Sequence, residues 1–431
     1  MNVIGIRHEN KSKWEGRIPL VPSDVDALIK EHSLKFRVES SPIRAFAAEA
    51  LANAGAVVTD DISDCPVIIG LKEIPPDKLL PNKTYVYFSH TIKGQPENMP
   101  ALRRLMELNC QLIDYERIVD DKNRRLVFFG PFAGFAGMID TLWAFGRRLT
   151  HEKIDSPFSL IKPAHDYDSL DQAKRGIAEV GELIKRDGLP ESLTPLVCGF
   201  AGYGQVSRGA QEVYDVLPVK EVSPDDLPSI APDPKACYKV VFREEHLATQ
   251  AGSSAPFKLQ EYYDHPDRYQ PDFFRHAPYL SMLVNCIYWE PKYPKLLTRE
   301  EFRRLHEQEA GTRLRVVGDI TCDIDGSLEC TTHTTTPDSP VYVYDPVTGQ
   351  THDGVTGEGP VVLAVDFLPC ELPVDASNFF SKALKPLIPV LAGADFKAEL
   401  PDSGLSPEWQ RATIVYHGKL TEPYEYLKEH L

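Results

Sequence analysis

One stretch of the chain decides the fold that we expect: Leu196-Val-Cys-Gly199-Phe-Ala-Gly202-Tyr-Gly204-Gln-Val-Ser207-Arg-Gly209-Ala210. It begins as an apolar strand, passes through closely spaced glycines and continues as a helical segment. A strand, a glycine turn and a helix in this order form the setting of a dinucleotide-binding fingerprint. Gly202 and Gly204 permit the turn and the close approach of a pyrophosphate, and the helix presents its N-terminal amides to that anion. The stretch therefore predicts a Rossmann-like domain, although a glycine turn without a ligand has the same pattern.

The fingerprint is incomplete at its third glycine, where the chain has Ser207. Glu221 stands about 20 residues beyond the loop, where an acidic residue accepts a hydrogen bond from the ribose 2′-hydroxyl of NAD. Its neighbour Lys220 would instead favour the 2′-phosphate of NADP, so we expect NADP or NAD and leave the choice open. The residues expected to bind the cofactor in this region are Gly202, Gly204, Gln205, Val206, Ser207 and Glu221.

Strand-like and helix-like segments alternate on both sides of this stretch. Apolar runs predict strands at Val3–Ile6, Phe36–Val38, Val67–Leu71, Thr84–Phe88, Gln111–Tyr115, Val240–Phe242, Leu283–Tyr288 and Arg315–Asp319. Helices are expected between the early strands, at Ser23–His32, Ile43–Ala54 and Glu97–Leu108. This alternation is typical of parallel βαβ units. We therefore predict an α/β protein with two Rossmann-like domains, parallel sheets and an interdomain cleft.

The first of the two predicted domains is discontinuous. Residues 1–135 with residues 375–431 are expected to form a substrate-binding and catalytic domain, and residues 136–374 a dinucleotide-binding domain. The segment Ala376–Leu391 has a helical pattern that two prolines must kink or end. Because the last part is too short to be a domain, we expect it to pack on the N-terminal one.

Charge and composition disfavour several classes of protein. The chain has 47 Lys and Arg against 63 Asp and Glu, a net charge of −16, which disfavours nucleic acid and anionic membranes as partners. No apolar run approaches the ~20 residues of a membrane span, and the N-terminus lacks a signal-peptide pattern. The eight cysteines are scattered through apolar runs, as expected for buried thiols in a reducing compartment, so we expect a cytoplasmic protein. Cys322, Cys330 and His333 match no zinc-binding spacing, and we expect no metal.

Three polar residues follow strand-like segments in the N-terminal part: Arg17, Lys72 and His90. Because ligands gather at the carboxyl ends of parallel strands, Lys72 and His90 are expected to share one site. An apolar setting lowers the pKa of a lysine and lets it act as an acid or a base, and histidine transfers protons near neutrality. Arg17 can bind a carboxylate through two parallel hydrogen bonds. Taken singly, each of the three, and Glu116 after the next strand, also fits an ordinary surface charge or ion pair.

Seven segments, in order over nearly the whole chain, resemble the saccharopine dehydrogenase family. They are Phe88–Gln95, Leu112–Glu116, Ala133–Met138, Gly202–Gln211, Tyr263–Tyr269, Asn285–Glu290 and Cys322–Glu329. They are most similar to the lysine–ketoglutarate reductase domain of the bifunctional lysine-degrading enzyme of animals and plants. Gly70–Pro75 looks more like the lysine-forming saccharopine dehydrogenase of fungi, and alanine dehydrogenase is more distantly similar.

The resemblance implies roles for individual residues. It implies that Lys72 and His90 are catalytic, that Arg17 binds a substrate carboxylate, and that Glu116 lies in the substrate site and tunes the catalytic lysine. It also implies that the nicotinamide end of the cofactor meets Asn285, Cys286, Ile287 and Asp319.

The same resemblance implies an oxidoreductase that reversibly condenses L-lysine and 2-oxoglutarate to saccharopine with hydride from NADPH. A separate glutamate-forming saccharopine dehydrogenase is then an expected partner, because the sequence holds no counterpart of the second dehydrogenase half of the bifunctional enzyme. Three alternatives stay open: an NAD-dependent, lysine-forming enzyme, a reaction like that of alanine dehydrogenase, and a nucleotide-binding protein without catalysis. The long aromatic excursion at 223–280 favours the degradative type, and the presence of both Lys72 and His90 argues against the last alternative.

Overall fold

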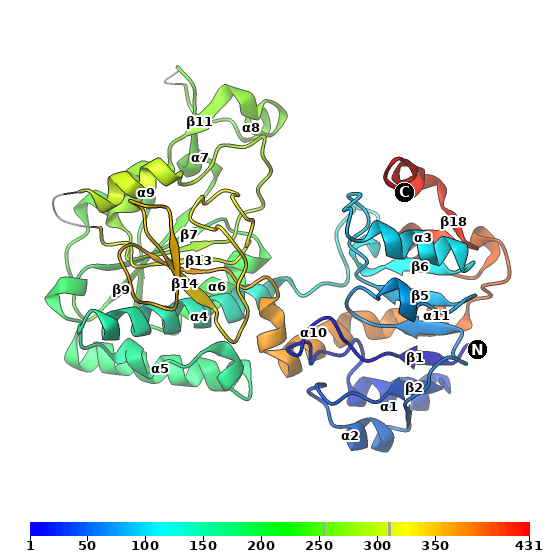
Figure 1. Ribbon diagram of the computed structural model, residues 1–431. Coiled ribbons are helices and arrows are strands. Elements are labelled where there is room, and N and C mark those ends of the chain that lie inside the picture. The colour runs from blue at the N-terminus through cyan, green and yellow to red at the C-terminus, as the bar shows by residue number, and fades with distance from the viewer. Residues whose placement is uncertain (253–254, 309–311) are drawn as a thin grey trace. The chain divides into compact units, whose positions relative to one another are not determined.

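The computed structural model describes residues 1–252, 255–308 and 312–431, which form two compact units (Figure 1). Unit 1 comprises Met1–Phe129 and Pro373–Leu431, and unit 2 comprises Gly130–Leu372. The helix α4 (Gly130–His151) packs against α6 (Gln205–Tyr214) and other elements of unit 2. The first change of unit therefore falls before α4, a few residues earlier than the sequence-based boundary.

Unit 1 is built on one eight-stranded sheet in the order β18-β17-β6-β5-β4-β1-β2-β3. Its first six strands are all parallel: β1 (Ile4–Ile6), β2 (Phe36–Glu39), β3 (Val57–Thr59), β4 (Val67–Ile69), β5 (Thr84–Tyr87) and β6 (Gln111–Asp114). The C-terminal segment adds two antiparallel strands beside β6, which are β17 (Thr413–Tyr416) and β18 (Lys419–Leu420).

Helices cover both faces of this sheet because side chains alternate along its strands. Ile69 and Val86 belong to one buried cluster, while the neighbouring Ile68 and Tyr85 belong to the cluster on the other face. The helices of unit 1 are α1 (Pro22–His32), α2 (Ala48–Asn53), α3 (Met99–Glu107), α10 (Pro373–Leu384), α11 (Ile388–Gly393) and α12 (Pro407–Ala412). The fully buried Trp409 of α12 packs in the first cluster, so residues after Pro373 complete the core of unit 1.

Unit 2 has a second eight-stranded sheet in the order β15-β14-β16-β13-β12-β7-β9-β8. Six strands are parallel: β7 (Leu196–Ala201), β8 (Val219–Glu221), β9 (Cys237–Phe242), β12 (Met282–Asn285), β13 (Val316–Asp319) and β16 (Val361–Leu363). The antiparallel strands are β14 (Val341–Tyr344) and β15 (Thr351–Asp353), and a separate pair is formed by β10 (Ala248–Gln250) and β11 (Tyr269–Pro271). The helices other than α4 and α6 are α5 (Leu170–Asp187), α7 (Glu244–Leu247), α8 (Leu259–Asp264) and α9 (Arg299–His306).

The predicted α/β class with two Rossmann-like domains is confirmed by these two mostly parallel sheets. Both sheets place short, mostly apolar strands between layers of helices, as parallel sheets require. Among the described helices, none combines the length and the apolarity needed to cross a membrane. All eight cysteines are buried, and none forms a disulfide bond in the described chain.

Candidate functional site

The carboxyl ends of four neighbouring strands in unit 1 bring charged residues to one edge of the sheet. The parallel strands lie in the order β1-β4-β5-β6. The residues at or just beyond their ends include Glu9, Lys72, His90 and Asp114. Four separate segments of the chain thus contribute to one site, as expected at the carboxyl edge of a parallel sheet.

Lys72 follows β4, and its side chain is largely shielded from solvent. Burial lowers the pKa of the Lys72 amine, and the nearby charge of Arg17 lowers it further. The carboxylates of Glu15 and Glu73 act on it in the opposite direction without cancelling the shift. An amine with a lowered pKa can give or take a proton nearer neutrality.

His90 follows β5, and the carboxylate of Glu73 binds its ring. The atoms His90 Nδ1 and Glu73 Oε1 are 2.5 Å apart, and Lys11 Nζ lies 2.9 Å from both oxygens of the same carboxylate. Burial alone would raise the pKa of Glu73, but the hydrogen bond and charge of His90 and the hydrogen bond from Lys11 lower it to about 2. The ionised carboxylate accepts a hydrogen bond from the Nδ1–H group, which leaves Nε2 as the acceptor atom of the ring.

The backbone of His90 is in the left-handed region, with φ at +49°. Asn98 Nδ2 donates to the carbonyl oxygen of His90 at 3.1 Å, and the ring stacks on Phe88 with 6.4 Å between centroids. Left-handed backbone in a residue other than glycine is uncommon and recurs at functional sites. The conformation turns the imidazole to the side of Glu73.

Arg17 is fixed by a buried ion pair and an aromatic ring. Its Nε and Nη2 donate to the two oxygens of Glu15 at 2.6 and 2.5 Å, and both side chains are only 3% exposed. The guanidinium lies over the ring of Phe129, 4.3 Å from its centroid. A planar guanidinium held in this way keeps a fixed orientation.

Two buried carboxylates fasten the loops that carry the candidate catalytic residues. Glu9 accepts hydrogen bonds from the backbone N–H groups of Leu71 and Lys72, at 2.7 and 3.0 Å. Asp114 accepts from the backbone N–H of Ser89 at 2.9 Å and also from its hydroxyl. Burial raises the pKa of Glu9, and it raises that of Asp114 to about 6, against the effect of their hydrogen bonds.

Glu116 has a different partner from the one that its predicted role requires. Its Oε1 accepts a hydrogen bond from Arg125 at 2.8 Å. The carboxylates that act on the pKa of Lys72 are Glu15 and Glu73. A role for Glu116 beside the catalytic lysine stays a prediction.

Sequence reasoning assigned no role to four carboxylates at this edge, which are Glu9, Glu15, Glu73 and Asp114. Glu15 and Glu73 stand close in sequence to Arg17 and Lys72, so their proximity was a usable signal. Glu9 and Asp114 bind loops that are remote along the chain, and no spacing reveals such contacts.

In unit 2 the glycine loop joins β7 to α6. Gly202 has φ at +94°, and a Cβ there would lie 3.2 Å from the carbonyl oxygen of Cys286. Gly204 has an ordinary φ of −73°, and a Cβ there would meet no described atom within 4 Å. The fold therefore requires glycine at 202 but not at 204, where the missing side chain leaves space beside the first amides of α6. Such a space fits the pyrophosphate of a dinucleotide.

Ser207 accounts for the incomplete fingerprint. It is fully buried in the first turn of α6, and its hydroxyl donates to the carbonyl oxygen of Gly202 at 2.7 Å. Gln211 Nε2 donates to the same hydroxyl at 2.9 Å. The serine thus ties the helix to the glycine loop where the usual third glycine allows close packing.

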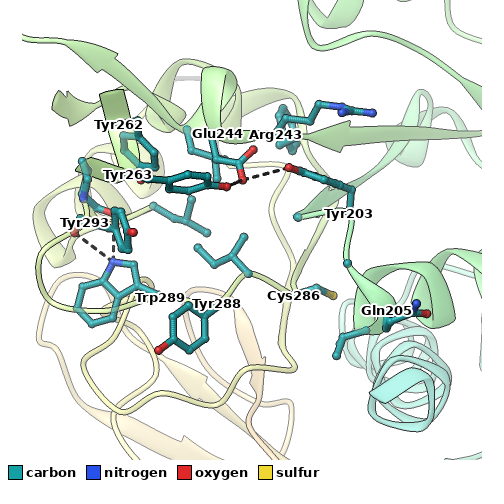
Figure 2. Close-up of a pocket in the computed structure, with 18 residues that line it drawn as sticks. Tyr203, Gln205, Arg243, Glu244, Tyr262, Tyr263, Cys286, Tyr288, Trp289 and Tyr293 are labelled. Carbon is teal, nitrogen blue, oxygen red and sulfur yellow. Dashed lines mark hydrogen bonds between the residues drawn. The ribbon is translucent and has the colours of Figure 1, made fainter. Parts of the chain in front are cut away.

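A cavity of about 490 Å³ opens beside the glycine loop (Figure 2). This volume is in the range of cofactor sites. Aromatic rings form one wall, and in Figure 2 Tyr262, Tyr263 and Tyr293 lie together near Trp289. The cavity is lined by Gly202, Tyr203, Gly204, Gln205, Val206, Phe242, Arg243, Glu244, Leu247, Tyr262, Tyr263, Cys286, Ile287, Tyr288, Trp289, Tyr293, Pro294 and Leu296. Four of the predicted loop residues therefore lie on it.

Glu221 does not line the cavity, and its contact with the cofactor ribose stays a prediction. It ends β8, which is separated from β7 by β9, and it pairs with Lys239 in the middle of β9. Its carboxylate is 67% exposed and lies 3.1 Å from Lys239 Nζ. The residue that leaves the neighbouring strand level with Gly202 is instead Arg243.

The four residues expected at the nicotinamide end separate into two pairs. Cys286 and Ile287 line the cavity, whereas Asn285 and Asp319 are fully buried at the ends of β12 and β13. Asn285 Nδ2 donates to Asp319 Oδ1 at 2.9 Å. Asp319 also accepts from Thr321 at 2.6 Å, and burial raises its pKa despite these bonds. This buried network shapes the turn after β12.

Comparisons with known proteins match most of unit 1 to a family model and nearly the whole chain to individual proteins. Residues 5–136 match the family model "Alanine dehydrogenase/PNT, N-terminal domain". The chain is 36% identical to alpha-aminoadipic semialdehyde synthase of Arabidopsis thaliana, over 99% of this chain and 41% of that protein. It is 34% identical to the mitochondrial alpha-aminoadipic semialdehyde synthase of Mus musculus, over 99% of this chain and 48% of that protein. The NAD⁺-dependent, L-lysine-forming saccharopine dehydrogenase of Neurospora crassa is 29% identical, over 97% of this chain and 96% of that protein.

Over nearly its whole length the chain is similar to alpha-aminoadipic semialdehyde synthases and to an L-lysine-forming saccharopine dehydrogenase. The resemblance proposed from the sequence is thus confirmed, and the chain spans about half the length of the synthases that it matches. L-alanine dehydrogenase has the same fold, with a TM-score of 0.62 and 16% identity over 99% of this chain and 98% of that one. The dehydrogenase name of one relative and the fold shared with L-alanine dehydrogenase support an enzyme with a nicotinamide cofactor. The mitochondrial name of one relative leaves the predicted cytoplasmic location untested.

Proposed function

We propose that the chain reversibly condenses L-lysine with 2-oxoglutarate to form saccharopine, with NADPH as the reductant. The observation that carries the proposal is the pair formed by Lys72, whose pKa is lowered, and His90, whose ring is bound by Glu73. Both stand at the ends of adjacent strands in a chain similar to an L-lysine-forming saccharopine dehydrogenase. The loop and cavity of unit 2 fit a dinucleotide, and when bound its nicotinamide supplies the hydride.

The residues of unit 1 perform the acid–base steps. His90 Nε2 takes a proton from the lysine ε-ammonium, so that the neutral amine can attack the keto carbon of 2-oxoglutarate. Lys72 gives a proton to the keto oxygen and takes one from the amine nitrogen as the carbinolamine forms. Protonated His90 then gives its proton to the carbinolamine hydroxyl, which leaves as water with formation of the iminium ion. Arg17 holds a substrate carboxylate, with its guanidinium oriented by Glu15.

Glu73 prepares His90 for its role as a base. Its ionised carboxylate fixes the tautomer in which Nε2 is the proton acceptor, and it stabilises the imidazolium that forms. Lys72 is suited to the opposite role, that of an acid, because its lowered pKa makes proton donation easier near neutrality. The two groups are therefore suited to act as base and acid in one site.

The test is the loss of reduced-nicotinamide absorbance when purified protein is mixed with L-lysine, 2-oxoglutarate and NADPH or NADH. We expect lysine-dependent oxidation, and we expect Lys72→Met and His90→Gln each to slow turnover by ~10²–10⁴-fold. Lys78→Met is the matched control, because Lys78 is exposed, also follows β4 and pairs only with the neighbouring Asp77 in the described chain. Near-normal turnover of both active-site variants would contradict the assignment.

The same assay separates the alternatives. A preference for NADH would favour the NAD-dependent, lysine-forming reaction that the name of the Neurospora crassa relative describes. Oxidation with another amine and keto acid but not with lysine would favour a reaction like that of alanine dehydrogenase, whose fold the chain shares. Nucleotide binding without oxidation of any pair would favour a protein without catalysis.

A further inference from the structure

The strand order of unit 2 brings Arg243 to the glycine loop. β9 lies beside β7 in parallel register, with Ala201 opposite Phe242. The N–H of Gly202 donates to the carbonyl oxygen of Phe242 at 3.0 Å, so Arg243 leaves the sheet at the level of the glycine turn. In a Rossmann domain, the residue after the strand next to the glycine-loop strand meets the ribose of the adenosine half.

The side chain of Arg243 is held over the loop itself. Its guanidinium lies over the ring of Tyr203, 4.7 Å from the centroid, and Tyr203 stands between the two glycines of the turn. Figure 2 shows the two side chains next to each other at the same end of the cavity. Among the described residues that line the cavity, Arg243 is the one that carries a positive charge. A planar guanidinium is well suited to bidentate binding of a phosphate.

The next residue, Glu244, binds other side chains of the protein. Its Oε1 accepts hydrogen bonds from the hydroxyls of Tyr263 at 2.7 Å and Tyr203 at 3.3 Å. These bonds tie the tyrosine of the glycine loop to α8. The carboxylate oxygen nearest the loop is therefore engaged by the protein, in contrast to the acidic residue that accepts from a ribose 2′-hydroxyl in NAD-dependent domains.

Aromatic rings beyond Arg243 provide a surface for a base. Tyr262 packs on Tyr293 with 5.2 Å between centroids, and Tyr263 packs on the same ring at 6.5 Å. Trp289 is fixed by hydrogen bonds from its Nε1 to the carbonyl oxygens of Tyr293 and Pro294. Stacking on aromatic side chains is a common way to bind a nucleobase. The cavity therefore offers a base surface, a phosphate-binding cation and a pyrophosphate turn in succession.

We propose that Arg243 binds the 2′-phosphate of NADP(H) and thereby sets the cofactor preference, with Tyr203 as the residue that positions its guanidinium. The inference rests on the proposed function only in that the bound dinucleotide is a nicotinamide cofactor. In this proposal Arg243, and not Glu221 or Lys220, decides between NAD and NADP. Lys220 pairs with Asp233 at 2.7 Å on the edge strand β8.

The test uses two probes that contain neither nicotinamide nor amino acid: adenosine 2′,5′-bisphosphate and adenosine 5′-monophosphate. Isothermal titration of the full chain is expected to show tighter binding of the bisphosphate. Arg243→Ala is expected to lower the affinity for the bisphosphate by about 10-fold or more and to leave the affinity for the monophosphate unchanged. Arg275→Ala is the matched control, because Arg275 is half exposed, pairs with Asp272 and does not line the cavity.

The positioning role of Tyr203 has its own comparison. Tyr203→Phe keeps the ring under the guanidinium and loses only the hydroxyl, so bisphosphate selectivity should survive. Tyr203→Ala removes the ring and should reduce the selectivity toward that of Arg243→Ala, because the cation–π contact is lost. A role confined to stability would instead lower the affinity of both probes together.

Several outcomes would overturn the proposal. They are equal binding of the two probes by the unaltered protein, no binding of either, and an Arg243→Ala variant that keeps the selectivity. Lysine-dependent oxidation without bisphosphate selectivity would refute this inference and leave the proposed function standing. Selective bisphosphate binding without lysine-dependent oxidation would do the reverse.

Discussion

The carboxyl edges of the two sheets are built from different kinds of side chain. In unit 1 the edge carries ionisable groups in pairs, such as Glu15 with Arg17 and Glu73 with His90. In unit 2 the edge carries the glycine turn and a cavity with one aromatic wall, and the described lining residues include one cation and one carboxylate. The first edge is equipped to move protons, and the second is equipped to hold a large, flat, phosphate-bearing molecule.

The difference shows what each kind of site needs from the fold. Charged side chains keep a fixed geometry only when other groups hold them, and in unit 1 the buried carboxylates of Glu9 and Asp114 hold the two loops. The unit 2 site depends on backbone shape, so its requirements are steric and local. Substitutions should therefore reduce folding stability mainly in unit 1 and ligand affinity mainly in unit 2.

The largest expected effect comes from removing the anchor of Lys72. Glu9→Ala leaves the buried N–H groups of Leu71 and Lys72 without their acceptor, and it leaves Arg7 without its buried partner. We expect a loss of about 3 kcal/mol in the free energy of unfolding, measured with urea. Turnover should also fall, because the loop that carries Lys72 is released, while affinity for adenosine 2′,5′-bisphosphate should stay unchanged.

Glu31→Ala is the matched control for this prediction, because Glu31 is an exposed glutamate on α1 in the same unit. It should leave both stability and turnover unchanged. A loss below about 1 kcal/mol for Glu9→Ala would show that water or a shifted side chain replaces the lost acceptor. The contrast between the two edges would then be weaker than the hydrogen bonds indicate.

The two glycines of the unit 2 turn give a contrast within one loop. Gly204→Ala adds a Cβ to open space with an allowed φ, so the fold should keep its stability while the affinity for the bisphosphate probe falls about 10-fold or more. Gly202→Ala forces alanine to φ of +94° and crowds the carbonyl oxygen of Cys286. It should therefore lower the free energy of unfolding by about 1–2 kcal/mol.

Both variants are titrated with the bisphosphate probe and unfolded with urea, so that affinity and stability are measured separately. The expectation fails if Gly204→Ala binds the probe as the unaltered protein does, because the open space would then not be where the phosphates lie. It also fails if the alanine at 204 reduces stability as much as the one at 202, since the structure shows strain only at the latter position.

Much of the fold was predictable because strand and helix signals are local. The apolar runs ending before Lys72 and His90 predicted parallel strands whose ends meet, and β4 and β5 are indeed neighbours. Residues 413–416 form the strand β17, which was not predicted from the sequence. Its pairing with β6 joins segments far apart in the chain, and no local pattern reveals such a pairing. The anchoring contacts of Glu9 and Asp114 escaped prediction for the same reason.

The prediction for Glu221 depends on an assumption about strand order. Counting residues from the glycine loop assumes that the next strand in sequence is also the next strand in the sheet. In unit 2 the next strand in sequence is β8, but β9 lies between it and β7. Sequence distance therefore selected an edge residue, while the position level with the loop belongs to Arg243.

The smallest expected effect concerns Ser207, the residue by which the loop departs from the usual fingerprint. Ser207→Gly restores the third glycine but removes the hydrogen bond to the carbonyl oxygen of Gly202 and places glycine in the first turn of α6. We expect the free energy of unfolding to fall by about 1 kcal/mol. Bisphosphate affinity should not change, because the serine side chain is fully buried behind the loop. Ser207→Ala removes the hydroxyl without the cost of a helical glycine and should lose less stability. If either variant instead bound the probe more weakly while the protein kept its stability, the serine would be part of the binding surface. Unit 2 would then depend on a polar anchor as unit 1 does.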